Sequence, residues 1–111
     1  MAETFNRASA ALTTSFAQIY AAPTTTGNVS VVLSVLVANV DGTADASVDL
    51  CIYDGATALT GGKLANTLLV LQDSSIELIP NKLVLKAGES LYAKASAAGD
   101  LEVTVSALEI T

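Results

Sequence analysis

Histidine and tryptophan are absent from this sequence, and cysteine occurs once, at position 51. A Ser–His or Cys–His nucleophile pair is therefore excluded. One cysteine cannot supply a zinc cluster or an intrachain disulfide. The Gly-Gly-Lys at residues 61–63 is too bare to be a phosphate-binding glycine loop. We therefore expect a protein that is not an enzyme and that carries no cofactor or metal.

Basic residues are scarce, with five Lys and Arg against eleven Asp and Glu, a net charge of −6. They are scattered, at Arg7, Lys63, Lys82, Lys86 and Lys94. Phosphate contacts need clustered positive charge, so we expect no nucleic-acid partner and no binding to an anionic membrane. The longest apolar run, near residues 31–40, is about half of what a membrane-spanning helix needs. The N-terminal residues lack a signal-peptide pattern, which predicts synthesis in a cytoplasm.

Carboxylates are the remaining candidates for chemistry. Asp41, Asp45, Asp49 and Asp54 crowd one segment, and such oxygen clusters can hold calcium, but they match no calcium-loop spacing. Aspartates at turns and on exposed strand faces are the ordinary interpretation. Sugar hydrolysis is disfavoured by the few aromatic residues, two Phe and three Tyr. Cys51 alternates with apolar neighbours, which indicates a buried small hydrophobe more than a reactive thiol.

Charge is low overall. Charged residues make up 14% of the chain and hydrophobic residues 51%. Globular domains usually carry about a quarter charged residues. Because interface cores are depleted of charge, this composition favours a chain that works packed against other subunits.

Residues 27–39 form the longest apolar stretch and predict a strand at the centre of the fold, since they are rich in β-branched side chains. Strand alternation divides them into two faces. The face expected on the core holds Val29, Val31, Leu33, Val35 and Val37. The second face is left to a loop, a partner subunit or solvent, and holds Ser30, Val32, Ser34, Leu36 and Ala38.

Seven further segments read as short strands: residues 15–21, 46–53, 63–71, 76–79, 82–85, 90–96 and 101–110. Turn residues separate them every eight to twelve positions, a spacing typical of all-β sandwiches. We predict an antiparallel β-sandwich of about eight short strands over residues 15–111, jelly-roll or immunoglobulin-like. The Asp-Gly turn near residue 41 predicts that the strands on either side of it form a hairpin.

Residues 1–14 carry few large apolar side chains and predict an extended N-terminal arm, with Phe5 and Leu12 as its anchors. A short helix over residues 3–11 is the alternative. At the other end of the chain, Leu108 and Ile110 fall on the polar side of the last strand. A bulge or an interface would explain them.

Segments 81–91 and 94–109, together with the strand and turn over residues 23–42, resemble the small β-sandwich virion structural proteins of tailed bacteriophages. The resemblance covers residues 15–111. It implies a virion protein whose partners are the major capsid protein or other virion proteins, and a homo-oligomer, with a trimer favoured. It does not decide between capsid decoration, neck, tail and fibre.

The first functional hypothesis is a decoration or cement protein that stabilises the head by binding between capsomers. The runner-up is a neck or tail component. A third is a carbohydrate- or host-binding module of a fibre, using Tyr53 or Tyr92 and the loop over residues 54–62. For the first, we expect the contacts with neighbouring subunits to be made by Phe5, Arg7, Leu12, Val32, Leu36, Leu108 and Ile110.

Overall fold

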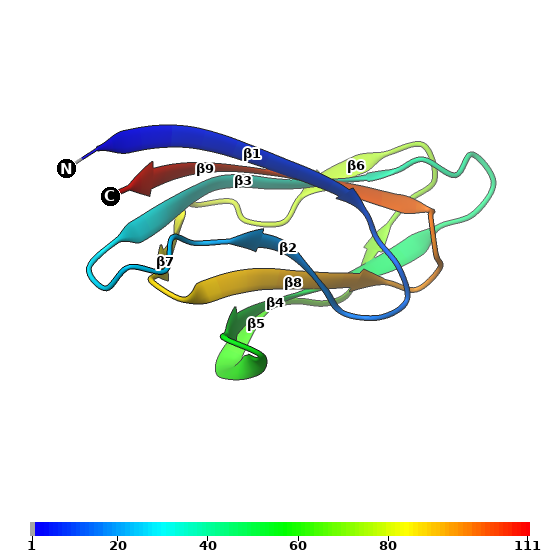
Figure 1. Cartoon of the computed structure of the whole chain (residues 1–111). Helices are drawn as coiled ribbons and strands as arrows, with labels where there is room; N and C mark the ends of the chain where they lie inside the picture. The colour runs from blue at the N-terminus through cyan, green and yellow to red at the C-terminus, as the bar shows by residue number, and fades with distance from the viewer. Residues whose placement is uncertain (1) are drawn as a thin grey trace.

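The computed structural model describes residues 2–111, which form nine β-strands in two antiparallel sheets (Figure 1). Sheet A contains β1 (Glu3–Ala11), β9 (Leu101–Ile110), β3 (Val29–Asn39) and β6 (Ser75–Glu77) in that order, and β7 (Leu83–Lys86) also pairs with β3. Sheet B contains β2 (Ala17–Ala21), β8 (Glu89–Ala95), β4 (Ala46–Asp54) and β5 (Thr57–Val70). The two sheets lie face to face, so the predicted all-β sandwich is confirmed. Within residues 2–111, no helix is long and apolar enough to span a bilayer.

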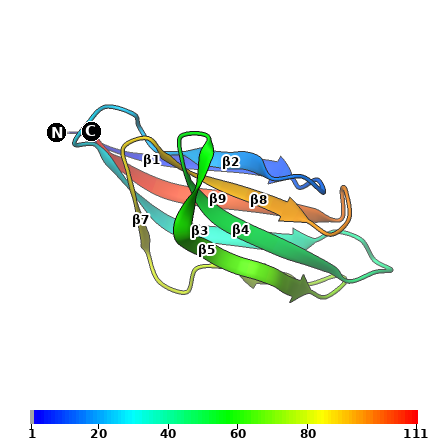
Figure 2. The same ribbon diagram turned by 90° about the horizontal axis from the view of Figure 1, so that it is seen from below.

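The core lies between the sheets and is built from alternate residues of the strands. In β4, β8 and β9 alternate apolar residues face the core; for example Leu50, Leu91 and Leu101 are fully buried. β3 lies in the middle of sheet A, paired with β9 on one side and with β6 and β7 on the other (Figure 2).

β3 does not keep the single alternation that we predicted. Its register against β9 shifts between Val32 and Ser34, so Leu33 is an extra, bulged residue. Before the bulge, Ser30 and Val32 face the core; after it, Val35 and Val37 do. A one-residue bulge moves every later side chain to the opposite face. Val29, Val31 and Leu33 therefore lie on the outer face, and the prediction that they cover the core was wrong.

The segment expected as an arm is a strand of the sandwich. β1 pairs with β9 over its whole length, from Glu3 opposite Ile110 to Ala11 opposite Glu102, without a register shift. The expectation of an arm outside the body, and the alternative of a helix over residues 3–11, are therefore corrected. Backbone pairing holds β1 in place, and this requires no large apolar side chains.

β3 and β4 lie in different sheets, which contradicts the hairpin predicted around Asp41. The buried side chain of Asn39 organises the crossing. Its Nδ2 donates to the carbonyl oxygens of Ala44 and Val70, both at 3.0 Å, and its Oδ1 accepts from the N–H of Asp41 at 2.9 Å. These bonds satisfy the loop backbone where the chain passes from one layer to the other.

Candidate interaction surface

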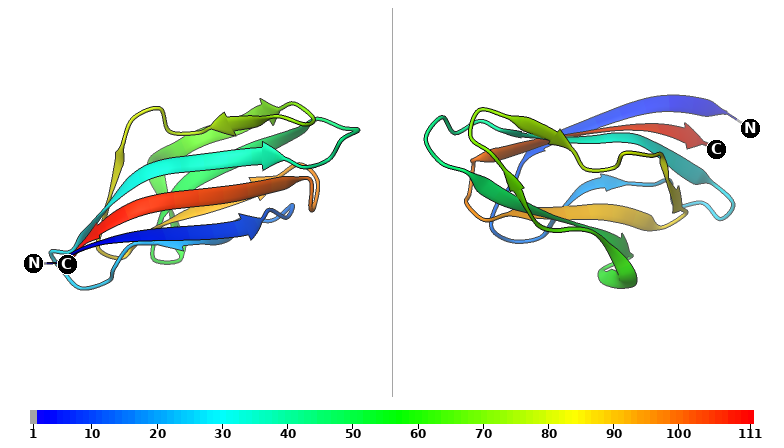
Figure 3. Two further views of the ribbon diagram at one scale, coloured as in Figure 1. Left: turned by 90° about the horizontal axis from the view of Figure 1, so that it is seen from above. Right: turned by 180° about the vertical axis from the view of Figure 1, so that it is seen from behind.

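Both termini lie at the same end of sheet A (Figure 3). The outer face of the sheet carries a group of apolar side chains at this end. Phe5, Leu108, Val31 and Val84 lie directly opposite one another on β1, β9, β3 and β7 and form one row across four strands. Ile110 and Val29 are paired in the next row. We call this set, with the bulged Leu33, the apolar face: Phe5, Val29, Val31, Leu33, Val84, Leu108 and Ile110.

The most exposed members of the apolar face are Phe5, at 77%, and Val84, at 57%. The other five are half-buried. A shallow hollow of about 490 Å³ opens beside Phe5 and is lined by Arg7, Leu33 and Ser106 among others. Contiguous apolar patches are one sign of a contact surface, which makes the apolar face the candidate interaction surface of this chain.

Charged side chains flank this face. Glu3 is paired with Ile110, Lys86 is paired with Val29, and Arg7 follows Phe5 on the same side of β1. All three are exposed. Neither Glu3 nor Arg7 forms an ion pair with another residue in the described range.

The seven predicted contact residues divide into two groups. Phe5, Arg7, Leu108 and Ile110 gather on and beside the apolar face, and Leu36, 42% exposed, lies further along the outer side of β3. Two residues were predicted wrongly, because they are in the core. Leu12 directly follows β1, donates its N–H to Leu101 and packs its side chain in the core at 2% exposed. Val32 is fully buried because the β3 bulge turns it inward.

Sequence reasoning missed Val29, Val31, Leu33 and Val84 as surface residues. The first three were assigned to the core by an alternation that the bulge interrupts. Val84 lies in a strand of four residues. Because Leu83, Val84 and Leu85 are all apolar, the segment shows no alternation that would indicate which face is buried.

The outer face of sheet B brings together the two tyrosines of the carbohydrate hypothesis. Tyr53 and Tyr92 stack with ring centroids 3.8 Å apart, and Phe16 lies 6.2 Å from Tyr53. The ammonium groups of Lys94 and Lys63 lie 4.9 Å and 5.3 Å from the centre of the Phe16 ring. The facing surfaces of the two tyrosine rings are therefore occupied by each other, so they are not open to stack on a sugar.

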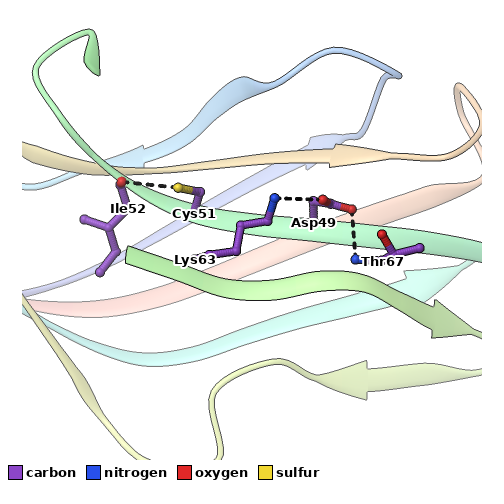
Figure 4. A network of polar contacts seen from close by, with 5 residues as sticks. All are labelled: Asp49, Cys51, Ile52, Lys63 and Thr67. Carbon is purple, nitrogen blue, oxygen red and sulfur yellow. Dashed lines mark hydrogen bonds and ion pairs between the residues drawn. The ribbon is translucent and has the colours of Figure 1, made fainter. Parts of the chain in front are cut away.

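Lys63 also pairs with Asp49, at 3.0 Å, and the N–H of Thr67 donates to the other carboxylate oxygen at 3.1 Å (Figure 4). Burial of Asp49 by itself raises the pKa of this carboxyl. The bonds from Lys63 and Thr67 outweigh that effect, so the pKa of Asp49 lies below its usual value. The Cys51 thiol beside this network is buried and donates to the carbonyl of Ile52.

The four candidate calcium ligands do not converge. Asp41 accepts from the backbone and hydroxyl of Thr43, which hold the pKa of Asp41 below its ordinary value. Asp45 accepts from the N–H of Gln72. No group of three or more His, Cys, Asp or Glu within residues 2–111 is placed to share a metal ion.

Beneath the apolar face, between the sheets, lies one buried polar cluster. The hydroxyl of Tyr20 donates to Glu109 at 2.6 Å and lies 2.7 Å from the hydroxyl of Ser30. Burial, together with the bond to Glu109, raises the pKa of Tyr20 to about 12. The cluster joins β2 of sheet B to β3 and β9 of sheet A.

No protein-family model matches this chain, and no curated protein matches it. Among solved structures, the chain resembles one from Bacillus endospore appendages, described as a novel family of disulfide-linked pili. The TM-score is 0.57 at 17% identity, over 99% of this chain and 87% of that one. This likeness shows a shared fold.

Two structures of a pentameric capsid protein from metagenomic phage sequences align less closely. For both, the TM-score is 0.45 at 23% identity over 92% of this chain. The alignments cover 59% and 60% of those proteins. A likeness of this degree supports no further statement about this chain.

Proposed function

We propose that this chain is a bacteriophage virion structural protein, and that it acts as a capsid decoration or cement protein by binding between capsomers. The observation that carries the proposal is the apolar face, which lies open across four strands of sheet A. The sequence resemblance to small β-sandwich virion proteins gives the class of partner, the major capsid protein. On this proposal the protein works by surface contact and catalyses no reaction.

The Bacillus appendage protein supports the proposal, because a protein that shares this fold is described as forming pili. Its pili are described as disulfide-linked. Cys51 is the one cysteine in this sequence and is buried. Assembly of this chain is therefore proposed to rest on non-covalent contacts, whose weak individual affinities are multiplied by the many sites of a capsid.

The test is binding to expanded empty capsids of the phage that encodes the chain. We expect high-copy binding and a rise in the melting temperature of the capsid. A variant with Phe5→Thr and Val84→Thr should lose most of this binding. The control is Leu69→Thr with Leu71→Thr, because the two leucines are 55% and 54% exposed. Leu69 lies in β5 of sheet B, and Leu71 directly follows that strand. Equal binding by both variants would contradict the assignment of the apolar face.

A neck or tail position is the alternative within the same virion. It predicts a few to a dozen copies per particle, whereas a decoration protein is present on most capsomers. Quantitative mass spectrometry of purified virions separates the two.

A further inference from the structure

We propose that a second copy of this chain binds along the free edge of β1, antiparallel, with Phe5 opposite Phe5 and Glu3 opposite Arg7 of the second copy. The inference deepens the proposed assembly role by naming the contact between copies. Its test uses purified protein without capsids, so its failure is separate from a failure of capsid binding.

The backbone of β1 is left half-paired. Leu12 donates its N–H to Leu101 at 2.9 Å, and Thr111 donates to Ala2 at 2.8 Å. Bonded pairs alternate along an antiparallel ladder, so the even-numbered residues of β1 bond to β9. The odd-numbered residues, Glu3 to Ala11, direct their N–H and C=O groups to the other side. Among residues 2–111 no strand pairs with that side.

The other sheet edges are short or irregular. The far side of β3 is covered by β6 and β7, and between them the Glu77 carboxylate accepts the N–H of Val35 at 2.7 Å. In sheet B, β2 has five residues and a register shift, and β5 is irregular at three places. Bulges and short strands are how proteins prevent edge pairing. β1 has nine residues, one unbroken register and no proline.

The side chains of β1 select one register. Because the odd-numbered residues carry the free N–H and C=O groups, they must lie opposite odd-numbered residues of the second copy. In an antiparallel pair the numbers of any two opposite residues have the same sum, so one opposite pair defines the whole register. Arg7 opposite Arg7 places like charges together, which is unfavourable. Of the remaining registers, only Phe5 opposite Phe5 places Glu3 directly opposite Arg7, and it does so twice. Neither Glu3 nor Arg7 has an ion-pair partner within residues 2–111, so this register pairs the two charges without breaking an ion pair. The N–H of Arg7, which donates to the Asn6 side-chain oxygen at 2.8 Å in the single chain, exchanges that acceptor for the C=O of Glu3 in the second copy.

The two-fold axis of this pairing is perpendicular to sheet A. The outer faces of the two copies therefore point in the same direction, and the apolar face continues from one copy into the next through the two Phe5 rings. The contact closes with two copies. A trimer, as the sequence resemblance implied, would need a different surface.

The decisive experiment uses charge exchange. Glu3→Arg alone and Arg7→Glu alone each put like charges opposite each other, twice per dimer. We expect sedimentation equilibrium to show at least a tenfold higher dissociation constant than for the unmodified chain. Mixed one to one, the two variants pair opposite charges at both positions, and the mixture should form heterodimers of near-original affinity. Both residues are exposed, and circular dichroism checks that the fold is kept.

Cross-linking tests the register. Directly opposite bonded residues have Cα atoms about 5.5 Å apart, within disulfide range. Phe5→Cys should therefore give a covalent dimer under mild oxidation. Ser9→Cys, on the same side of the same strand, is the control, because its two copies would be roughly 26 Å apart at 3.3 Å per residue. The unmodified chain, with Cys51 buried, should give none.

Three results would each overturn the inference: an unmodified chain that stays monomeric at millimolar concentration, a mixture of charge variants no more associated than its components, or cross-linking through Ser9→Cys in place of Phe5→Cys.

Discussion

The outer faces of the two sheets differ in how their side chains are partnered. On sheet B the aromatic rings stack on one another, Lys63 and Lys94 lie over Phe16, and Asp49 is bound by Lys63 and Thr67. On sheet A, Phe5 is 77% exposed, and within residues 2–111 neither Glu3 nor Arg7 forms an ion pair. Similar residue types thus stabilise the monomer on one face and are left open on the other. Chemical type alone does not distinguish the two faces; whether the side chains have partners within the chain does.

The largest expected effect is on sheet B. Tyr53→Ala removes a ring that contacts both Phe16 and Tyr92, and we expect it to lower the free energy of unfolding by about 2–3 kcal/mol. Phe5→Ala on sheet A should change it by less than about 0.5 kcal/mol, because the Phe5 ring is largely in solvent. Urea denaturation at low protein concentration measures both. If both substitutions lowered the free energy of unfolding equally, the outer faces of sheets A and B would not differ in how much their side chains stabilise the monomer.

The next effect concerns the polar cluster that joins the two layers. Tyr20→Phe removes the bonds to Glu109 and Ser30 and should cost about 1–2 kcal/mol at pH 7. The pKa of Tyr20 is raised in the fold, to about 12 from an ordinary value of about 10. The stabilisation is therefore complete below pH 10 and is lost as the pH rises toward 12. Chemical denaturation from pH 8 to 11.5 should show a steeper alkaline decline for the unmodified chain than for Tyr20→Phe.

A smaller effect is expected at the ion pair of sheet B. Asp49→Asn should lower stability by about 1 kcal/mol at pH 7, because Lys63 keeps its charge and loses its partner. Because the pKa of Asp49 is depressed in the fold, its stabilisation is present above the unfolded value, about 3.9, and is lost as the pH falls through the lower folded value. The difference between the two proteins should therefore shrink below pH 4. A difference that persists at pH 2 would show that the carboxylate charge is not the cause.

The smallest effect on stability is expected at Val84. Val84→Thr keeps the β-branched shape and should change the free energy of unfolding by less than about 0.5 kcal/mol. It should nevertheless reduce the binding of a hydrophobic fluorescent dye, because it interrupts the apolar row. Leu69→Thr, at a similar exposure on sheet B, should reduce dye binding less. A larger loss of dye binding in Leu69→Thr than in Val84→Thr would show that the main dye-binding surface lies on sheet B.

Much of the fold could be predicted from the sequence because most strands alternate regularly. In β9 the apolar residues from Leu101 to Ala107 face inward, as their spacing predicts. The same alternation, continued without a bulge, places Leu108 and Ile110 outside beside Phe5. Of the two explanations offered for these residues, a bulge is thereby excluded in β9, and an interface stays a prediction.

The errors have a common cause in backbone pairing, which side-chain patterns report poorly. β1 was predicted as an arm because its side chains are small, yet its order comes from main-chain bonds to β9. The Asp-Gly turn indicated a hairpin, but the chain crosses between sheets, held by the buried amide of Asn39. In both cases the deciding interactions involve main-chain atoms, which every residue type carries.

The extra residue at Leu33 has a consequence for how this protein should be aligned with distant relatives. Even-numbered residues of β3 face the core before Leu33, and odd-numbered residues face it afterwards. In a relative without the extra residue, aligned from the later part of the strand, odd-numbered positions would face the core over residues 29–32 as well. An ungapped alignment would then match the interior of one protein to the exterior of the other. A one-position gap at residue 33 restores the correspondence. Substitution rates at buried and exposed positions of β3 should then be compared separately before and after residue 33.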